Sequence, residues 1–153
     1  TERLLKSLSA SGRVINLSAA ALSPVSLAAL KGEGTLSDGA AYAQSKLALT
    51  MWTAALAEAL GPDGPTVVSV NPGSLLGTKM VRDAFGTSGN DISIGVDILL
   101  RAALSDEFAN ADGRYFDNDI GRFGKPHPEA TNPQKCRAVL QTVRELSKRH
   151  AGM

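Results

Sequence analysis

Two short apolar runs most constrain what this chain of 153 residues can fold into. "RVINLSAA", residues 13–20, and "TVVSV", residues 66–70, are rich in β-branched and aliphatic residues and show little alternation with polar ones. Strands of this kind are buried on both faces, as happens when helices cover both sides of a parallel sheet. Between the two runs, a helical pattern begins near Ser37 or Asp38 and ends at about Leu60, before "GPDGP". The sequence therefore predicts an α/β protein with a doubly wound parallel sheet.

The rest of the chain continues the alternation of helices and strands. We expect the end of a helix before Gly12, an irregular connection from 22 to 36 and a mobile segment at 75–91. After these we expect a helix at 91–104, a short strand at 113–118, a polar loop, and a last helix with Pro133 in its first turn. Ligands of such sheets bind beyond the carboxyl ends of the strands. "NLSAAALSP" and "NPGSLLGTK" leave those ends, so we expect the functional site there.

Composition excludes several classes of function. A formal net charge of +1 gives no electrostatic basis for binding nucleic acid. Cys136 is the single cysteine, which permits no internal disulfide and fits a reducing cytoplasm. His127 and His150 lack the spacing of metal ligands, so we expect no metal site. No apolar run approaches the roughly 20 residues of a membrane helix, and we expect no membrane segment.

Within the long predicted helix, "AYAQSKLAL" places Tyr42 four residues before Lys46. Side chains four residues apart lie on one face of a helix and can be neighbours. A free tyrosine has a pKa of about 10, but a nearby ammonium stabilises the phenolate, so such a pair can exchange a proton with a hydroxyl or carbonyl group. The spacing alone is also common on ordinary helix surfaces, so its context decides between the two interpretations.

Four stretches, "GRVINLSA", "AYAQSKLAL", "VVSVNPGSLLGTKM" and "GRYF", come in the order found in short-chain dehydrogenases/reductases. The chain resembles the C-terminal half to two-thirds of that family, and these stretches are spread over most of its length, from residue 12 to residue 116. The long segment before Tyr42 and the "SLLGTKM" sequence are similar to the retinol-dehydrogenase-like, WW-domain-oxidoreductase-like members. The resemblance implies a Rossmann-type fold, NAD or NADP as cofactor, and hydride transfer between the nicotinamide and a small alcohol or carbonyl substrate.

The resemblance also implies roles for particular residues. Tyr42 matches the family's proton donor or acceptor, and Lys46 matches the lysine that assists the tyrosine and holds the nicotinamide ribose. Pro72 and Gly73 match the turn beside the nicotinamide. The segment that touches the carboxamide and pyrophosphate holds Leu75 and Thr78. Residues 75–91 match the mobile loop that closes over the substrate, and family members form homodimers or homotetramers.

The sequence departs from the family pattern at the catalytic serine. Members usually carry two serines at the end of this strand, and the second polarises the substrate carbonyl; here the pair is Ser18 and Ala19. Ser18 is therefore the candidate catalytic hydroxyl, although neighbouring strand residues point to opposite faces, which favours a structural role for it. Losing such a donor typically costs on the order of 10²–10³ in rate.

The family's phosphate-binding glycine motif, which follows its first strand, has no counterpart here, because "GEGTLSDG" at 32–39 follows no strand. We therefore expect residues 1–153 to form the catalytic, C-terminal part of a single domain whose N-terminal cofactor-binding part is absent from the chain.

The alternative is a catalytically impaired relative that acts as an oligomerisation or interaction module. In the family the helix that carries the Tyr–Lys pair dimerises, and here its stripe holds Leu47, Met51, Ala54 and Ala55. Sugar-nucleotide epimerases share the Tyr–Lys pair but fit the "NPG" turn less well.

Overall fold

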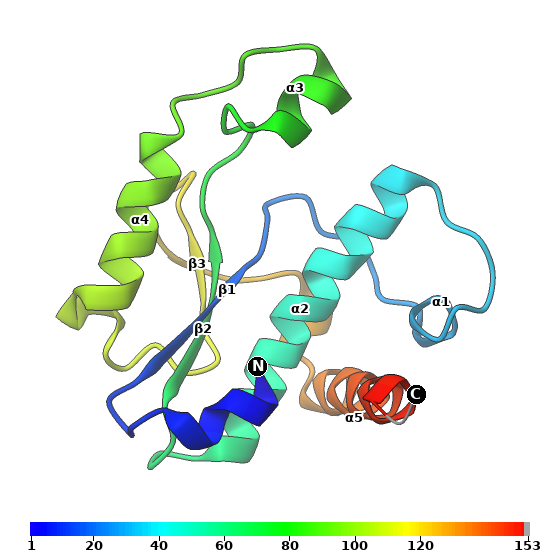
Figure 1. The fold of residues 1–153 in the computed structure, drawn as a ribbon, viewed down its shortest axis with the longest axis vertical. Coiled ribbons are helices and arrows are strands. Elements are labelled where there is room, and N and C mark those ends of the chain that lie inside the picture. The colour runs from blue at the N-terminus through cyan, green and yellow to red at the C-terminus, as the bar shows by residue number, and fades with distance from the viewer. Residues whose placement is uncertain (152–153) are drawn as a thin grey trace.

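A computed structural model describes residues 1–151 and shows a four-stranded sheet between helices (Figure 1). The strands lie in the order β1-β2-β3-β4, and their bounds are Arg13–Leu17, Thr66–Asn71, Tyr115–Asp117 and Arg122–Gly124. The first three strands are parallel, and β4 pairs antiparallel with β3. This is the Rossmann-type α/β arrangement that the apolar runs predict, with one difference: the segment expected to be a polar loop supplies the antiparallel edge strand.

The α-helices are α1 (Leu27–Leu30), α2 (Asp38–Leu60), α3 (Lys79–Phe85), α4 (Ser93–Leu104) and α5 (Pro133–Ala151). Three short 3₁₀ helices complete the structure: η1 (Glu2–Ser7), η2 (Asp106–Phe108) and η3 (Pro128–Thr131). The helix expected before Gly12 is thus present as η1. Among the described residues, no helix has both the length and the apolar character that crossing a membrane would require.

The two faces of the sheet are covered by different helices. Every residue of β2 is buried, and successive residues point to opposite faces. Val67 belongs to a core formed with α2 and α5, whereas Val68 and Val70 pack with α4 and with Phe108 and Phe116. Such burial on both faces explains the continuous apolar pattern of this strand. Strand β1 forms one edge of the sheet, and its residues are only half-buried or exposed.

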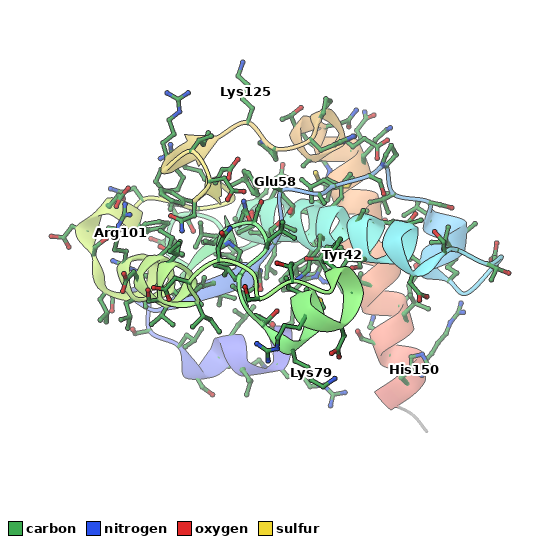
Figure 2. The ribbon with its side chains drawn as sticks, turned by 90° about the horizontal axis from the view of Figure 1, so that it is seen from above. Tyr42, Glu58, Lys79, Arg101, Lys125 and His150 are labelled. Atoms are coloured by element: carbon green, nitrogen blue, oxygen red, sulfur yellow. The ribbon has the colours of Figure 1, made fainter. Side chains whose placement is uncertain are left out.

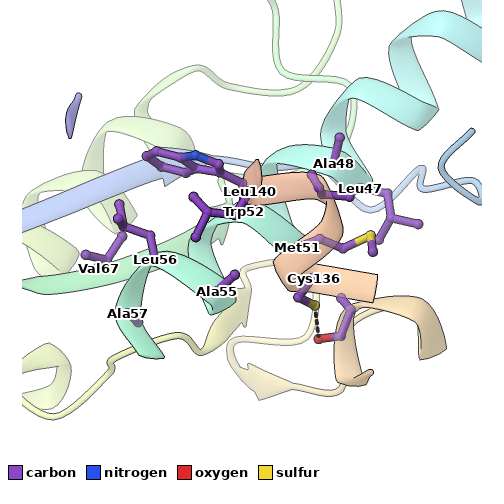
Figure 3. Packing of buried hydrophobic residues seen from close by; sticks show 12 residues of the cluster. Leu47, Ala48, Met51, Trp52, Ala55, Leu56, Ala57, Val67, Cys136 and Leu140 are labelled. Atoms are coloured by element: carbon purple, nitrogen blue, oxygen red, sulfur yellow. Dashed lines mark hydrogen bonds between the residues drawn. The ribbon is translucent and has the colours of Figure 1, made fainter. Parts of the chain in front are cut away.

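Helix α2 begins where the sequence predicts. The Ser37 hydroxyl caps it by accepting a hydrogen bond from the backbone N–H of Ala40, and Gly61 ends it in a positive-φ conformation. Its central stripe packs against α5 within the same chain: Leu47 and Met51 are almost completely buried there beside Leu140 (Figure 3). This stripe of α2, which the sequence offers as a surface for self-association, is therefore covered within the chain.

Two connections are more ordered than their sequences predict. The segment 75–91, expected to be mobile and irregular, contains α3, which Thr78 caps at its start and Gly86 ends. Its two ends meet in a short parallel bridge between Leu76 and Asn90. The connection before α2 contains the single-turn helix α1, capped by Ser26. Both helices are too short to give a readable hydrophobic period, which explains why the sequence pattern misses them.

Candidate active site

One cleft of about 650 Å³ lies at the carboxyl ends of β1 and β2, beneath α3. Its walls come from four segments: the residues after β1, the first turns of α2, the turn after β2, and α3. All seven predicted site residues line it: Ser18, Tyr42, Lys46, Pro72, Gly73, Leu75 and Thr78. A second hollow of about 760 Å³ lies between η1, α2 and α5, and its lining includes none of the residues at the strand ends.

The helical spacing of Tyr42 and Lys46 brings the two side chains together at the cleft. The Lys46 ammonium lies 5.6 Å from the centroid of the Tyr42 ring. It also donates a hydrogen bond of 2.9 Å to the backbone carbonyl of Leu17, the last residue of β1. This contact fixes the lysine between the strand end and the helix, and burial lowers its pKa from the ordinary value. Tyr42 remains 36% exposed, so its ring is accessible from the cleft (Figure 2).

Ser18 lines the cleft, but its hydroxyl is engaged in the protein interior. Its Oγ lies 2.7 Å from Thr50 Oγ1, and Thr50 donates its own proton to the carbonyl of Lys46. A hydroxyl has one proton, so Ser18 must be the donor in the bond to Thr50. In this arrangement Ser18 has no proton left for a substrate carbonyl, which favours its structural role. Ala19, which the resemblance aligns with the family's second serine, also lines the cleft.

The turn after β2 holds two residues with positive φ, Gly73 and Leu75. Gly73 has φ of +127°, a conformation that L side chains rarely adopt. Leu75 has φ of +50° and is the single non-glycine residue with positive φ among the described residues. Such strain costs on the order of 1–3 kcal/mol and persists when the surroundings hold it. Leu75 is half exposed and lines the cleft.

Helix α3 closes the cleft from above. Met80, Val81, Ala84 and Phe85 line it, which gives this wall an apolar surface. Thr78 lines the same wall, but its hydroxyl caps α3 by accepting from the N–H of Val81. The ends of the loop are held by backbone bonds between Asn90 and Leu75 and between Gly77 and Asn90.

Sequence reasoning missed the residues behind the cleft. Tyr115 is buried, and its hydroxyl donates to the carbonyl of Ala19 over 3.1 Å; burial raises its pKa, with the Asp117 and Asp119 charges as lesser causes. Asp119 accepts hydrogen bonds from Ser74 and Asn71. Burial acts to raise the pKa of Asp119, but these hydrogen bonds outweigh it and lower the pKa overall. These contacts join positions about 45 or more residues apart, so no local pattern announces them.

The mostly parallel sheet, its covering helices and a cleft at the strand ends define a Rossmann-type α/β protein with a ligand site. The family described as short chain dehydrogenase matches residues 5–88, more than half of the chain. The chain belongs to this family, and its type is that of the short-chain dehydrogenase/reductase oxidoreductases. No curated protein matches the chain.

Proposed function

We propose that this protein is an NAD(P)-dependent oxidoreductase that transfers a hydride between a nicotinamide and the carbinol or carbonyl carbon of a small, mostly apolar substrate. The observation that carries the proposal is the Tyr42–Lys46 pair, set at the cleft with the lysine anchored to the end of β1. Family membership supports the reaction type, and the cleft volume falls within the range of small-molecule sites.

The residues of the pair take different roles in this reaction. Tyr42 donates a proton to the substrate oxygen during reduction and removes it during oxidation. The ammonium of Lys46 has three N–H donors, and the Leu17 carbonyl occupies one of them. The other two are free for a ribose hydroxyl, while the positive charge stabilises a tyrosinate beside it.

The cleft suits the nicotinamide end of the cofactor. When bound, the nicotinamide supplies or accepts the hydride. Pro72 and Gly73 would lie beside its ring, Leu75 and Thr78 beside its carboxamide, and Lys46 would hold its ribose. Lys46 is the single cationic side chain among the described residues that line the cleft, which matches an uncharged amide and ribose better than a pyrophosphate.

The apolar wall supports the choice of substrate class. Leu75, Met80 and Phe85 are each about half exposed or more in the structure and face the cleft. Such surfaces gain free energy by contact with an apolar substrate, at about 25 cal/mol per Å² removed from water. A small aliphatic or aromatic aldehyde, ketone or alcohol therefore fits better than a sugar or a charged metabolite.

The proposal extends to the branch of the family, the part of the domain that the chain forms, its location in the cell and its oligomeric state. The long segment before Tyr42 and the "SLLGTKM" sequence support the retinol-dehydrogenase-like, WW-domain-oxidoreductase-like branch. We also propose that residues 1–153 form the catalytic part of one short-chain dehydrogenase domain. A cytoplasmic location and a homodimer or homotetramer stay predictions.

A second candidate function is an interaction module without catalysis. The observation that favours it is the absence of a hydroxyl at Ala19, together with the engagement of Ser18 by Thr50. The intact Tyr42–Lys46 pair favours the enzyme.

The test is the oxidation of NADH and NADPH by the purified protein with a series of small apolar aldehydes and ketones. Replacing Tyr42→Phe removes the proton donor and should lower turnover roughly 10²–10⁴-fold. Ser45→Ala is the matched control, because Ser45 lies on the same turn of α2 and its hydroxyl bonds only to the carbonyl of Tyr42. Equal, non-zero rates for both variants would exclude Tyr42 as the proton donor, and no turnover by the parent protein would favour the interaction module.

A further inference from the structure

The turn between β3 and β4 lies behind the cleft and carries Asp119, which contacts the opposite turn through both of its oxygens. One oxygen accepts the backbone N–H of Ser74 at 2.8 Å. The other accepts the Ser74 hydroxyl at 2.6 Å and the side-chain amide of Asn71 at 2.9 Å. All three partners donate, so this geometry favours the unprotonated carboxylate.

Neighbouring contacts extend the attachment along the turn Asn71–Ser74. Asn71 is 2% exposed and also donates to Asp117, while its side-chain oxygen accepts the N–H of Gly73. Asn118 donates to the carbonyl of Pro72 at 3.0 Å. Each of the four residues of the turn is therefore held by at least one side-chain hydrogen bond, and three of the four bond directly to residues 117–119.

This turn forms a wall of the cleft, whereas Asp119 is not among the residues that line it. Leu75 follows Ser74 directly and holds its positive-φ conformation between two attachments. On one side Asp119 holds Ser74; on the other, Asn90 donates its side-chain amide to the Ser74 carbonyl and its N–H to the Leu75 carbonyl. A strained residue keeps such a conformation only while its neighbours restrain it.

We propose that Asp119 is a positioning residue of the candidate active site: its carboxylate fixes the turn Asn71–Ser74, and with it Leu75, in the conformation that forms the cleft wall. The catalytic consequence rests on the proposed function, because the turn is the segment placed beside the nicotinamide. The structural part rests on the contacts alone. The contrasting interpretation is that Asp119 contributes only to global stability.

The decisive variant is Asp119→Asn, which keeps the shape but turns one acceptor oxygen into a donor that faces other donors. The matched control is Asp112→Asn. Asp112 accepts one backbone N–H, that of Val67, at the opposite end of β2. An asparagine there can still accept that bond, so the control has the same change of charge without the same loss of contacts.

Amide hydrogen exchange measured by NMR reads the position of the turn without any cofactor or substrate. In Asp119→Asn we expect exchange at Gly73, Ser74 and Leu75 to accelerate roughly 10- to 100-fold, the range for losing bonds to a charged acceptor. Exchange at Val68 and Val70 in the core of β2 should stay unchanged. Uniform acceleration along β2, or none in the turn, would overturn the proposal.

A second variant keeps the proposal testable if Asp119→Asn does not fold. Ser74→Ala removes the hydroxyl contact but keeps the backbone N–H bond to Asp119, so it should accelerate exchange in the turn by a smaller factor. Unchanged exchange in the turn of Ser74→Ala would overturn the proposal in that case.

Steady-state kinetics then tests the consequence for the site. We expect Asp119→Asn to lower kcat/KM by roughly 10-fold or more, since small displacements of positioning groups have large kinetic effects, while Asp112→Asn retains the parent value. Faster exchange confined to the turn with unchanged kcat/KM would overturn the positioning role. If the unmodified protein turns over no substrate, the proposed function fails, and the exchange data alone still decide whether Asp119 fixes the turn.

Discussion

Ala19 is the residue at which the cleft differs most from what its family implies. It lies directly after Ser18, is buried and lines the cleft. The Tyr115 hydroxyl holds its carbonyl from behind, so the backbone at this position is fixed. The resemblance implies a hydroxyl at this position, and the neighbouring Ser18 does not supply it because its proton is directed to Thr50.

Restoring that hydroxyl should increase activity. We predict that Ala19→Ser raises kcat/KM roughly 10²-fold, the lower end of the contribution expected from one such donor. Ala20→Ser is the control, because it adds a hydroxyl at the next, exposed position of the same wall. The measurement is the rate of NAD(P)H oxidation with the best carbonyl substrate. If both variants match the parent, Ala19 does not occupy the position of the substrate-polarising group.

The loop that carries α3 depends on two closely placed glycines, Gly77 and Gly89. Its two ends approach closely: a Cβ on Gly89 would lie 2.6 Å from the carbonyl oxygen of Leu75 and 2.8 Å from the Cα of Gly77. Both contacts are to backbone, which cannot move aside as a side chain can. These glycines therefore permit the closure that brings the apolar wall of α3 over the cleft.

Alanine substitutions at Gly89 and at Gly86 distinguish the effect of this close contact from the effect of backbone strain. Gly89 and Gly86 both have positive φ, +71° and +64°, but a Cβ on Gly86 would meet nothing within 4 Å. We predict that Gly86→Ala costs about 1–2 kcal/mol of unfolding free energy from strain alone. Gly89→Ala should cost more and should also weaken substrate binding, because the loop ends must separate. Equal costs in urea unfolding, with KM unchanged, would show that the two ends are not in contact.

Sequence patterns predicted an element well where the residues that define it lie within it or next to it, and poorly where it depends on distant residues. Helix α2 was predicted at both ends, since Ser37, the periodic apolar residues and Gly61 all lie within it or next to it. Strand β4 was missed because its three residues gain their order from pairing with β3. The proximity of Tyr42 and Lys46 was predicted from their spacing, whereas the contacts of Asp119 were not, because its partners lie 45 and 48 residues away.

For the whole molecule, the packing of α2 decides which apolar surfaces are left open to a second copy of the chain. The stripe of α2 that holds Leu47 and Met51 packs against α5, and Met51 is 1% exposed. Other apolar side chains are exposed instead on α4, where Leu104 is 78% exposed. The core that joins α2 to α5 thus belongs to the single chain and contributes to its own stability.

This arrangement predicts the effect of core truncation. Met51→Ala should lower the unfolding free energy by about 2–5 kcal/mol through the lost contacts and the cavity left behind. Leu104→Ala should change it by less than about 0.5 kcal/mol. The loss of stability caused by Met51→Ala should be the same at every protein concentration, because the contact is intramolecular. A concentration-dependent midpoint that Met51→Ala abolishes would instead place this face between two chains.

The most direct test of the central claim is to follow the hydride itself. The protein is incubated with a nicotinamide cofactor that carries deuterium at the transferring position and with a small apolar aldehyde, and the alcohol is analysed by mass spectrometry. We predict one deuterium on the carbinol carbon, and roughly 10²–10⁴-fold less of this alcohol per unit time when Tyr42→Phe replaces the parent protein. An alcohol without deuterium, or no alcohol at all from the parent protein, would contradict hydride transfer at this cleft.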